Sequence, residues 1–420
     1  MNFDLMRSLL IDRALRGELF SNVTSVEAEG KSLEEEQTTP FTIPNHWQWK
    51  RVADCVQFNP KVIQDDAVEV SFIPMADVEP GFVDHCSTRQ AKPWAKVKKG
   101  FSRFQEGDLL VAKITPCFQN RKSCVAKSLI NGTGAGSTEF HVMRCVSGVD
   151  AKFLLYFFKS EYFIRYGVNH FNGTVGQQRV GAQDIKDCLI PVPSVEEQVR
   201  IVAKLEDAFA EIDRAEKAYE ELQTLAGVLR GQILQEAIQG KLVPQLAEEG
   251  VVEQIGVAPD ERPFEIPKSW KWRALDEIFK FVDYRGKTPT KTTDGVRLIT
   301  ASNVRQGYVD HKRIEFISSE EYIDRQNRGI SKKGDILFTT EAPLGNVALA
   351  DLDVYSAGQR VITLQTDSEN KKLLMYFMLS PYFQKALKNN ATGTTAQGIK
   401  AARLKKLMLP VPPVEEQARI

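Results

Sequence analysis

The phrase PVPSVEEQVRI occupies residues 191–201, and PVPPVEEQARI occupies residues 410–420, where the sequence ends. Nine of the eleven positions in the two phrases are identical. So long a match within one chain indicates that a structural unit has been duplicated. The domain organisation therefore depends on how far the duplication extends.

Three further pairs of segments extend the repeat: PFTIPNHWQWKRV from Pro40 matches PFEIPKSWKWRAL from Pro263, EGDLLVAK from Glu106 matches KGDILFTT from Lys333, and NGTVGQQ from Asn172 resembles TGTTAQG from Thr392. The offsets are 223, 227 and 220 residues, and the opening phrase recurs at 219, so the order of the segments is kept. Such a period is too long for a solenoid. It predicts two similar domains in tandem.

The repeat is out of phase with the ends of the sequence. MRSLLIDRALRGELF from Met6 aligns with LRGQILQEAIQGKLV from Leu229, so the first residues correspond to the end of a helix whose beginning is present only in the other copy. The second copy stops at Ile420, whereas the first copy continues for about forty more residues. We therefore expect a chain that is shortened in its second long helix.

Residues 195–239 predict one long helix, because they contain no proline and only two glycines. Ser194 before two glutamates is typical of a helix start, and Gly240 is typical of a helix end. Apolar residues recur along this segment at spacings near three and four, and such a stripe has to be buried against another helix. The expected helix-packing interface consists of Val202, Leu205, Phe209, Ile212, Tyr219, Leu222, Leu225, Leu229 and Ile233.

The formal net charge of zero conceals two basic segments. Residues 40–193 carry a net charge of +5 and residues 262–408 carry +9, whereas residues 194–261 between them carry −9. Basic surfaces attract polyanions and acidic helices do not, so this pattern favours two nucleic-acid-facing domains joined by a connector that faces something else. No apolar run reaches the roughly 18 residues that cross a bilayer, and the amino terminus is too charged for a secretory signal. We expect a cytoplasmic protein without a membrane partner.

The sequence contains no complete catalytic motif. Gly286-Lys287-Thr288 resembles the end of a P-loop, but Phe281 stands where the first glycine is required. The six cysteines form no C-x-x-C pair and the five histidines form no H-x-x-x-H pair, so no metal site is proposed. The sequence thus predicts no catalytic residue, no metal and no bound cofactor.

Candidate DNA contacts are polar side chains in loops of the two basic segments. Gln can form two hydrogen bonds with adenine, Arg can do so with guanine, and Arg and Lys also bind phosphates. For every candidate an ordinary turn or cap is the alternative. The candidates are Gln177, Gln178 and Arg179 in the first domain, and Arg285, Lys287, Thr288, Ser302, Asn303, Arg305, Gln397 and Lys400 in the second.

Each basic segment predicts a mixed α/β domain. Short runs such as EVSFIPM, DLLVAKIT, VRLITA and DILFTT favour strands, and KFLLYFFKSEYFIRYG and KKLLMYFMLSPYFQKAL favour helices whose aromatic residues form the core. The expected class is α+β, with two α/β domains joined by long coiled-coil-like helices in a tandem pseudo-symmetric repeat. The expected divisions are a helix fragment at 1–20, a linker at 21–39, the first domain at 40–193, the central helix at 194–243, a linker at 244–261, the second domain at 262–409 and the start of a further helix at 410–420.

The duplicated P-V-P-x-V-E-E-Q phrases, the duplicated I-P-x-x-W-x-W segments from Ile43 and Ile266, and the G-D-[LI]-L turns at Gly107 and Gly334 resemble the specificity subunit of type I restriction-modification systems. The resemblance covers the whole chain. It implies that each basic domain is a target recognition domain that reads one half of a split, asymmetric site in double-stranded DNA. It also implies that long helices hold the two domains apart and dock methyltransferase subunits.

The resemblance also implies where the chemistry resides. Methyltransferase subunits supply the S-adenosylmethionine reaction, and restriction and translocase subunits supply steps that need ATP and magnesium, so this chain is expected to bind none of these cofactors. The shortened second helix implies either a truncated subunit or one that completes its helix pair with a second polypeptide, by self-association or through the methyltransferase. Two other functions stay open: a DNA methyltransferase or nuclease with degenerate motifs, and a noncatalytic protein-interaction scaffold.

Overall fold

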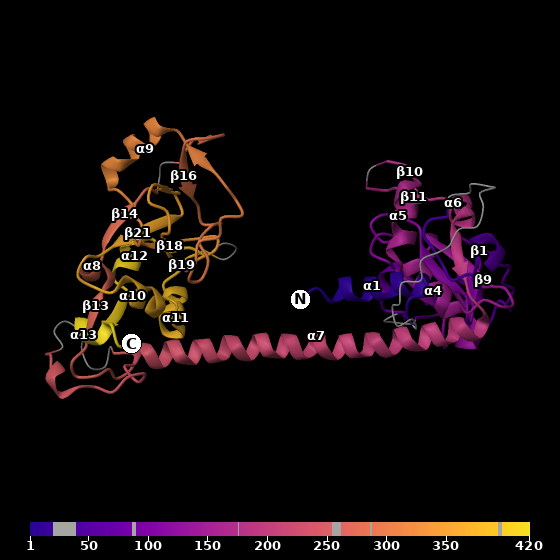
Figure 1. Cartoon of the computed structure of the whole chain (residues 1–420), viewed down its shortest axis with the longest axis horizontal. Helices are drawn as coiled ribbons and strands as arrows, with labels where there is room; N and C mark the ends of the chain where they lie inside the picture. Colours follow the sequence, from indigo (N-terminus) through magenta and orange to yellow (C-terminus); the bar gives the residue numbers. More distant parts are fainter. Residues whose placement is uncertain (20–38, 86–89, 175, 254–261, 286–287, 394–396) are drawn as a thin grey trace. The chain divides into compact units, whose positions relative to one another are not determined.

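The computed structural model describes residues 1–19, 39–85, 90–174, 176–253, 262–285, 288–393 and 397–420 (Figure 1). The chain divides into two compact units, Met1–Glu220 and Glu221–Ile420, and each unit has its own hydrophobic core. No helix in these ranges combines the length and the apolar character that crossing a membrane requires.

The first unit contains a helix at its amino terminus, a set of short strands and a pair of aromatic helices. Its strands are β1 (Gln48–Arg51), β2 (Val56–Phe58), β3 (Glu69–Ile73), β4 (Gln90–Pro93), β5 (Ser102–Gln105), β6 (Leu109–Ala112), β7 (Ser123–Val125), β8 (Thr133–Gly136), β9 (Phe140–Cys145), β10 (Phe171–Asn172), β11 (Arg179–Val180) and β12 (Leu189–Val192). Its helices are α1 (Phe3–Leu15), α2 (Val52–Cys55), α3 (Trp94–Val97), α4 (Ala151–Lys159), α5 (Glu161–Asn169), α6 (Ala182–Asp187) and the first part of α7 (Val195–Ile238).

The second unit contains the last part of α7 and a similar succession of elements. Its strands are β13 (Lys271–Ala274), β14 (Lys280–Asp283), β15 (Lys291–Thr292), β16 (Val296–Ile299), β17 (Phe316–Ile317), β18 (Ile336–Thr339), β19 (Val347–Leu349), β20 (Ser356–Ala357), β21 (Val361–Gln365) and β22 (Met408–Val411). Its other helices are α8 (Leu275–Ile278), α9 (Ser319–Arg325), α10 (Lys371–Met378), α11 (Pro381–Asn389), α12 (Ala401–Lys405) and α13 (Val414–Gln417).

The two units share the order of one antiparallel sheet, and they differ in where the parallel pair lies in a second sheet. An antiparallel sheet has the order β2-β9-β6-β7 in the first unit and β14-β21-β18-β19 in the second. A second sheet has the order β4-β3-β8-β5 in the first unit and β15-β17-β16-β20 in the second. Each second sheet contains one parallel pair, β3 with β8 and β16 with β20. The expected α+β class and the tandem repeat are therefore confirmed.

The duplicated phrases form a two-stranded sheet in each unit. β1 pairs antiparallel with β12, so that Trp49 lies opposite Pro191. β13 pairs in the same way with β22, so that Trp272 lies opposite Pro410. The beginning and the end of each domain are thus held together before the chain enters the following helix.

The glutamine of each phrase is buried and makes equivalent hydrogen bonds. The side-chain oxygen of Gln198 accepts from the N–H of Asp150, the N-cap of α4, at 2.7 Å. The side-chain oxygen of Gln417 accepts from the N–H of Asn370, the N-cap of α10, also at 2.7 Å. Each glutamine also donates to the carbonyl of the second proline in its own phrase, at 3.0 and 2.9 Å. The phrase occurs twice because each unit needs this buried, fully bonded link between its last strand and its aromatic helix.

Each predicted aromatic stretch forms two helices. Ser160 lies between α4 and α5 in extended conformation, and its hydroxyl accepts from the N–H of Phe163 as a helix cap. Ser380 separates α10 from α11 in the same way. The prediction that these aromatic residues form core is confirmed by buried side chains in both units, among them Phe153, Phe157, Phe158, Phe163, Phe377 and Phe383.

The helix α1 packs against the first half of α7. The ring centroids of Phe3 and Tyr219 are 6.0 Å apart, and the guanidinium of Arg7 contacts the carboxylates of Asp213 and Glu216 at 2.6 and 2.5 Å. Within this half, four of the expected packing residues are buried and Tyr219 is half-buried; the buried four are Val202, Leu205, Phe209 and Ile212.

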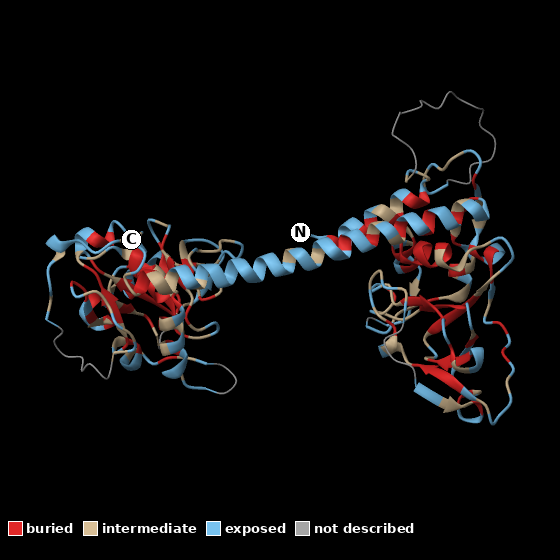
Figure 2. Ribbon diagram, turned by 90° about the horizontal axis from the view of Figure 1, so that it is seen from below, coloured by how far each residue is buried: buried red, intermediate tan, exposed pale blue. Residues whose placement is uncertain are grey.

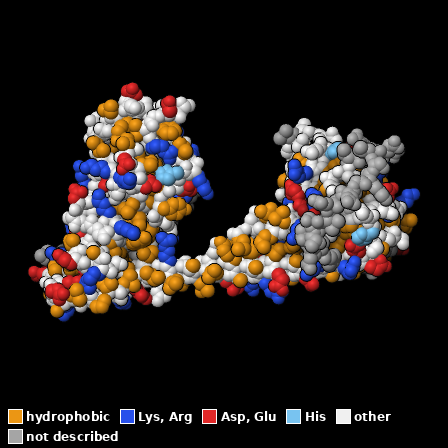
Figure 3. Space-filling model, in the orientation of Figure 1, with side chains coloured by type: hydrophobic (Ala, Val, Ile, Leu, Met, Phe, Trp, Pro, Cys, Tyr) orange, Lys and Arg blue, Asp and Glu red, His pale blue; other side chains and the backbone are white. Residues whose placement is uncertain are grey.

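The second half of the same stripe is exposed. Figures 2 and 3 show pale blue ribbon and orange side chains along this part of α7. The exposed fractions are 62% for Leu222, 65% for Leu225, 58% for Leu229 and 45% for Ile233. The predicted long helix is therefore present, but in the described chain only its first half has the expected partner.

Two glycines support the alignment of α1 with the end of α7. Gly17 and Gly240 follow these helices with φ values of +75° and +68°, in the left-handed region that favours glycine. A Cβ atom on either would lie 2.3 Å from the ring of a proline, Pro44 or Pro267. The same tight contact therefore ends both helices.

Candidate nucleic-acid interface

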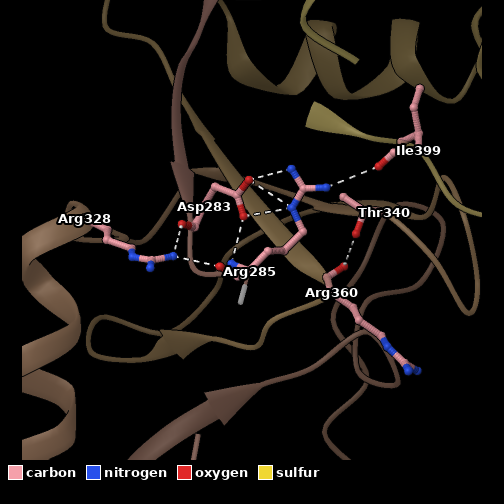
Figure 4. A network of polar contacts seen from close by, with 6 residues as sticks. All are labelled: Asp283, Arg285, Arg328, Thr340, Arg360 and Ile399. Carbon is pink, nitrogen blue, oxygen red and sulfur yellow. Dashed lines mark hydrogen bonds and ion pairs between the residues drawn. The ribbon is translucent and has the colours of Figure 1, made fainter. Parts of the chain in front are cut away.

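Four loop segments of the second unit meet at one edge of the sheet β14-β21-β18-β19 (Figure 4). The chain leaves β14 after Asp283, leaves β18 after Thr339 and enters β21 at Val361, and β21 pairs antiparallel with both neighbours. Residues 397–400 join this edge because the N–H of Ile399 donates to the carbonyl of Thr340 at 3.0 Å. We call residues 283–285, 288, 340–341, 358–360 and 397–400 the second loop edge.

Arg285 links two of these segments. Its Nη2 lies 2.6 Å from the carboxylate of Asp283, and its Nη1 donates to the carbonyl of Ile399 at 3.3 Å. Burial alone would raise the pKa of Asp283, but the hydrogen bonds from Arg285 outweigh it and hold that pKa below its usual value. Arg328 donates to the backbone carbonyl of Arg285 at 2.8 Å. The predicted phosphate contact Arg285 is thus 28% exposed and engaged in holding the loops.

More exposed polar side chains flank Arg285. Nε of Arg360 lies 2.8 Å from the carboxylate of Glu341, and the two side chains are 50% and 44% exposed. The hydroxyl of Thr288 donates to the side-chain oxygen of Gln359 at 2.8 Å, which places Thr288 on the same edge. Gln397 is exposed and lines a surface hollow beside α11. These groups can hydrogen-bond to bases or phosphates.

The first unit has an equivalent edge, because two backbone contacts recur in both units. The first contact is a β-bridge between a residue just after β6 or β18 and a residue shortly before the last strand of the unit. The second is a hydrogen bond from the N–H of the preceding residue to the carbonyl of the residue before β9 or β21. These contacts join Ile114 with Arg179 and Lys113 with Glu139 in the first unit, and Glu341 with Gly398 and Thr340 with Arg360 in the second. We call residues 113–115, 139 and 177–180 the first loop edge.

The three candidates of the first domain all lie on the first loop edge. Arg179 forms a bidentate ion pair with Glu139, with nitrogen–oxygen distances of 2.9 and 2.8 Å. The hydrogen bond from Arg179 holds the pKa of Glu139 below its usual value. The N–H of Gln178 donates to the hydroxyl of Thr115 at 3.1 Å, while Gln177 is exposed. The edge therefore presents one oriented guanidinium beside two amides.

Asn303 is not a surface residue. Its side chain has no exposed area; its amide nitrogen donates to the carbonyls of Asp310 and Arg313 at 2.9 and 2.8 Å. Its oxygen accepts from the N–H of Thr300 at 3.0 Å. The expectation that Asn303 contacts a base is wrong, because this side chain holds together the turn that follows β16.

The remaining candidates have different surroundings. Ser302 is half-buried and its hydroxyl is hydrogen-bonded within the same turn at 2.8 Å. Arg305 is half-buried and lies 3.7 Å from the carboxylate of Asp310. Lys400 is exposed at the N-cap position of α12. Lys287 lies outside the described residues.

The loop edges also contain charged and polar residues that were not among the predicted contacts, including Glu139, Glu341, Gln359 and Arg360. Each stands in a short turn next to a strand, and no motif marks it in the sequence. The backbone pairing of the strands is what brings these residues together. Across the described ranges, no three or more His, Cys, Asp or Glu side chains are placed to hold a metal ion.

The sequence matches the type I restriction modification DNA specificity domain twice, over residues 44–224 and 267–420. Among curated proteins, the specificity subunit of the Escherichia coli type I restriction enzyme EcoAI is 28% identical, with 99% of this chain and 87% of the relative aligned. The EcoEI specificity subunit of Escherichia coli is 26% identical over 83% of this chain and 74% of the relative. The MjaVIII specificity subunit of Methanocaldococcus jannaschii is 24% identical over 89% and 84%.

Two solved structures share the fold. A chain from a study of complex assembly and conformational transition of a type I R-M system superimposes with a TM-score of 0.68 at 20% identity, covering 90% of this chain and 89% of the other. The HsdS subunit of Thermoanaerobacter tengcongensis gives a TM-score of 0.53, also at 20% identity, with 90% and 88% covered.

Proposed function

This chain belongs to the family of type I restriction modification DNA specificity subunits, and from that premise we propose that each of its two units reads one half of a split, asymmetric site in double-stranded DNA. The site would be split because the two units are separate compact bodies. It would be asymmetric because the two loop edges present different side chains on the same backbone positions.

The repeated loop edge is the observation that carries this proposal. Equivalent backbone contacts fix both edges, yet Ile114, Glu139 and Arg179 in one correspond to Glu341, Arg360 and Gly398 in the other. A fixed scaffold with exchanged polar side chains is suited to recognising different base sequences, because hydrogen bonds to base edges specify sequence. The net charges of +5 and +9 over residues 40–193 and 262–408 suit both domains to the DNA backbone.

We further propose that α7 serves as the spacer and as a docking surface for methyltransferase subunits. Its exposed leucines offer apolar contacts, and residues 194–261 carry a net charge of −9 that disfavours DNA. In this proposal the chain is a noncatalytic subunit that acts in the cytoplasm. S-adenosylmethionine, ATP and magnesium would bind to the methyltransferase, restriction and translocase subunits with which it assembles.

The test is to express the chain with and without methyltransferase subunits and to incubate each preparation with DNA, labelled S-adenosylmethionine and magnesium. We expect the complex to methylate one split sequence and the chain alone to transfer no methyl group and to cleave nothing. Turnover by the chain alone would favour an enzyme with degenerate motifs. A complex that forms but neither binds nor modifies DNA would favour a protein-interaction scaffold.

A further inference from the structure

A glutamate–arginine pair lies on the loop edge of both units, but different positions supply it. In the first unit Glu139 precedes β9 and Arg179 begins β11. In the second unit Arg360 precedes β21 and Glu341 comes shortly after β18. Glu139 and Arg360 occupy equivalent positions, so the charge at that position is reversed while the pair is kept.

The pair of the first unit fixes the orientation of the guanidinium. Nε and Nη2 of Arg179 donate to the two carboxylate oxygens of Glu139 at 2.9 and 2.8 Å, and Nη1 donates to the carbonyl of Gln177 at 3.1 Å. A guanidinium has five N–H groups, so these contacts engage three of them and define its plane. The end that carries Nη1 and Nη2 is suited to two parallel hydrogen bonds with O6 and N7 of guanine.

The pair of the second unit lies beside a glycine. Glu341 bridges Gly398, and a Cβ atom on that glycine would lie 3.3 Å from the Cβ of Glu341. The absence of a side chain there leaves room for Glu341 beside Arg360, whose Nε it contacts at 2.8 Å. Arg179 occupies the position equivalent to Gly398 in the first unit. Each unit therefore has one arginine paired with a carboxylate on its loop edge, but the two arginines occupy different positions of the repeat.

The stability of the fold does not account for these pairs. Solvent screens exposed ion pairs, so they add little to stability, and the two arginines are 43% and 50% exposed. Arg285 shows the contrast, because it is 28% exposed and donates to the carbonyl of Ile399 inside the edge. A carboxylate that holds an exposed guanidinium in one orientation reduces the entropy lost when the arginine binds a base.

We propose that Arg179 and Arg360 each contact a guanine, and that Glu139 and Glu341 are the positioning residues that set this specificity. The inference rests on the proposed function, because it requires the loop edges to face DNA. Each half of the recognition site then contains at least one G·C pair that is contacted in the major groove.

The test uses the complex of the full chain with its methyltransferase subunits, together with duplexes that carry its methylated site. Replacing one guanine by 7-deazaguanine removes the N7 acceptor and keeps the base pair. We expect one such replacement in each half-site to weaken binding about tenfold or more. Arg179→Lys keeps the charge but lacks the planar guanidinium. A complex with this variant should therefore bind the normal duplex and the duplex with 7-deazaguanine in one half-site with equal affinity. A complex with Arg360→Lys should show the same equality for 7-deazaguanine in the other half-site.

Glu139→Gln and Glu341→Gln test the positioning role. Each should lower discrimination against a G·C to A·T change in its own half-site by roughly tenfold, while binding to unrelated DNA changes by less than about twofold. The matched controls remove exposed ion pairs elsewhere in each unit: Asp66→Asn beside Lys98, and Asp353→Asn beside Lys333. These controls should leave base discrimination unchanged.

Four outcomes would overturn the inference. A half-site made only of A·T pairs, or wild-type binding that is indifferent to 7-deazaguanine at every position, would refute it and leave the proposed function intact. An equal loss on all sequences in Arg179→Lys would make that arginine a phosphate contact. A wild-type complex without any sequence preference would refute both the inference and the proposed function.

Discussion

Lys159 lies in the core of the first unit. Its side chain at the end of α4 has no exposed surface, and its ammonium donates to the carbonyls of Gly81 and Arg121 at 2.8 and 3.0 Å. Burial lowers the pKa of Lys159 to about 7. The second unit has Leu379 at the equivalent position, directly before the serine that caps the next helix. An apolar side chain therefore suits this site, and Lys159 adds a link between two loops.

We predict that the first unit becomes more stable as the pH rises from 7 to 8.5. The folded-state pKa of Lys159 is about 7 and that of an exposed lysine is about 10.4, so the unfolded chain binds more protons in this range. The gain should be on the order of 1 kcal/mol and should disappear in Lys159→Leu. Thermal unfolding of the full chain at several pH values measures it.

The predicted pH range ends at 8.5 because buried cysteines reduce the stability above that pH. Burial raises the pKa of Cys145 and of Cys188 to about 12. Above the unfolded pKa of about 8.5 the unfolded thiols ionise and the folded ones do not, so the free energy of unfolding falls and opposes the effect of Lys159. Lys333→Leu, at a lysine that is 58% exposed, is the control and should keep the wild-type pH slope. If Lys159→Leu keeps that slope as well, the lysine does not titrate near neutral pH.

Sequence patterns predicted segments that meet at the two loop edges, but they did not identify all the side chains that lie there. Gln178 and Gln397 were predicted separately, and each directly precedes the residue that bridges the strand end in its own unit. Asn303 was misassigned because the carbonyls that accept from its amide lie seven and ten residues further along the chain. Arg360 was missed because its partner Glu341 is nineteen residues away, and only strand pairing brings the two side chains together.

At the scale of elements, α7 shows what periodicity can and cannot predict. The scarcity of proline and glycine predicted a helix over residues 195–239, and the structure has α7 at Val195–Ile238. The apolar stripe was predicted to be a packing face, but a stripe does not say which partner covers it. In the first half that partner is α1, through Phe3 and Arg7. In the second half the leucines remain exposed.

We predict that Leu225→Glu combined with Leu229→Glu reduces association through α7. Each leucine is worth roughly 1.5 to 3 kcal/mol when fully buried, so exposed leucines favour pairing with a second copy of the chain or with a methyltransferase subunit. Sedimentation should show wild-type species heavier than 47.3 kDa and a shift toward that mass in the double variant. Gln223→Glu, about 100° round the helix from Leu222, is the control. A wild-type chain that stays monomeric, alone and mixed with the methyltransferase, would contradict the prediction.

At the scale of the whole molecule, each unit is self-contained. The core of the first unit draws on α1, the strands around β9, the aromatic helices α4 and α5, and the first half of α7. The core of the second unit draws on the end of α7 and on residues from Phe264 onward. The same phrase closes each unit, because β12 pairs with β1 and β22 pairs with β13. The described core of each unit consists of that unit's own residues, so we expect one core to be kept when the other unit is replaced.

We predict that replacing residues 262–408 with the corresponding residues of another specificity subunit changes one half of the methylated sequence and leaves the other half intact. The replacement removes the whole second loop edge but keeps Glu139, Arg179 and their neighbours. It also keeps Gln417, whose bond to the backbone at position 370 does not depend on the side chain there.

Sequencing of methylated genomic DNA from cells that carry each exchange provides the measurement. The reciprocal replacement of residues 40–193 is the control and should change the opposite half-site. Because the loop edges are built on equivalent backbone contacts, each exchanged domain should recognise in the new chain the same half-site that it recognised in its original chain. A change in both halves after either exchange would mean that the two units do not recognise DNA independently, and reading by separate modules would then be wrong.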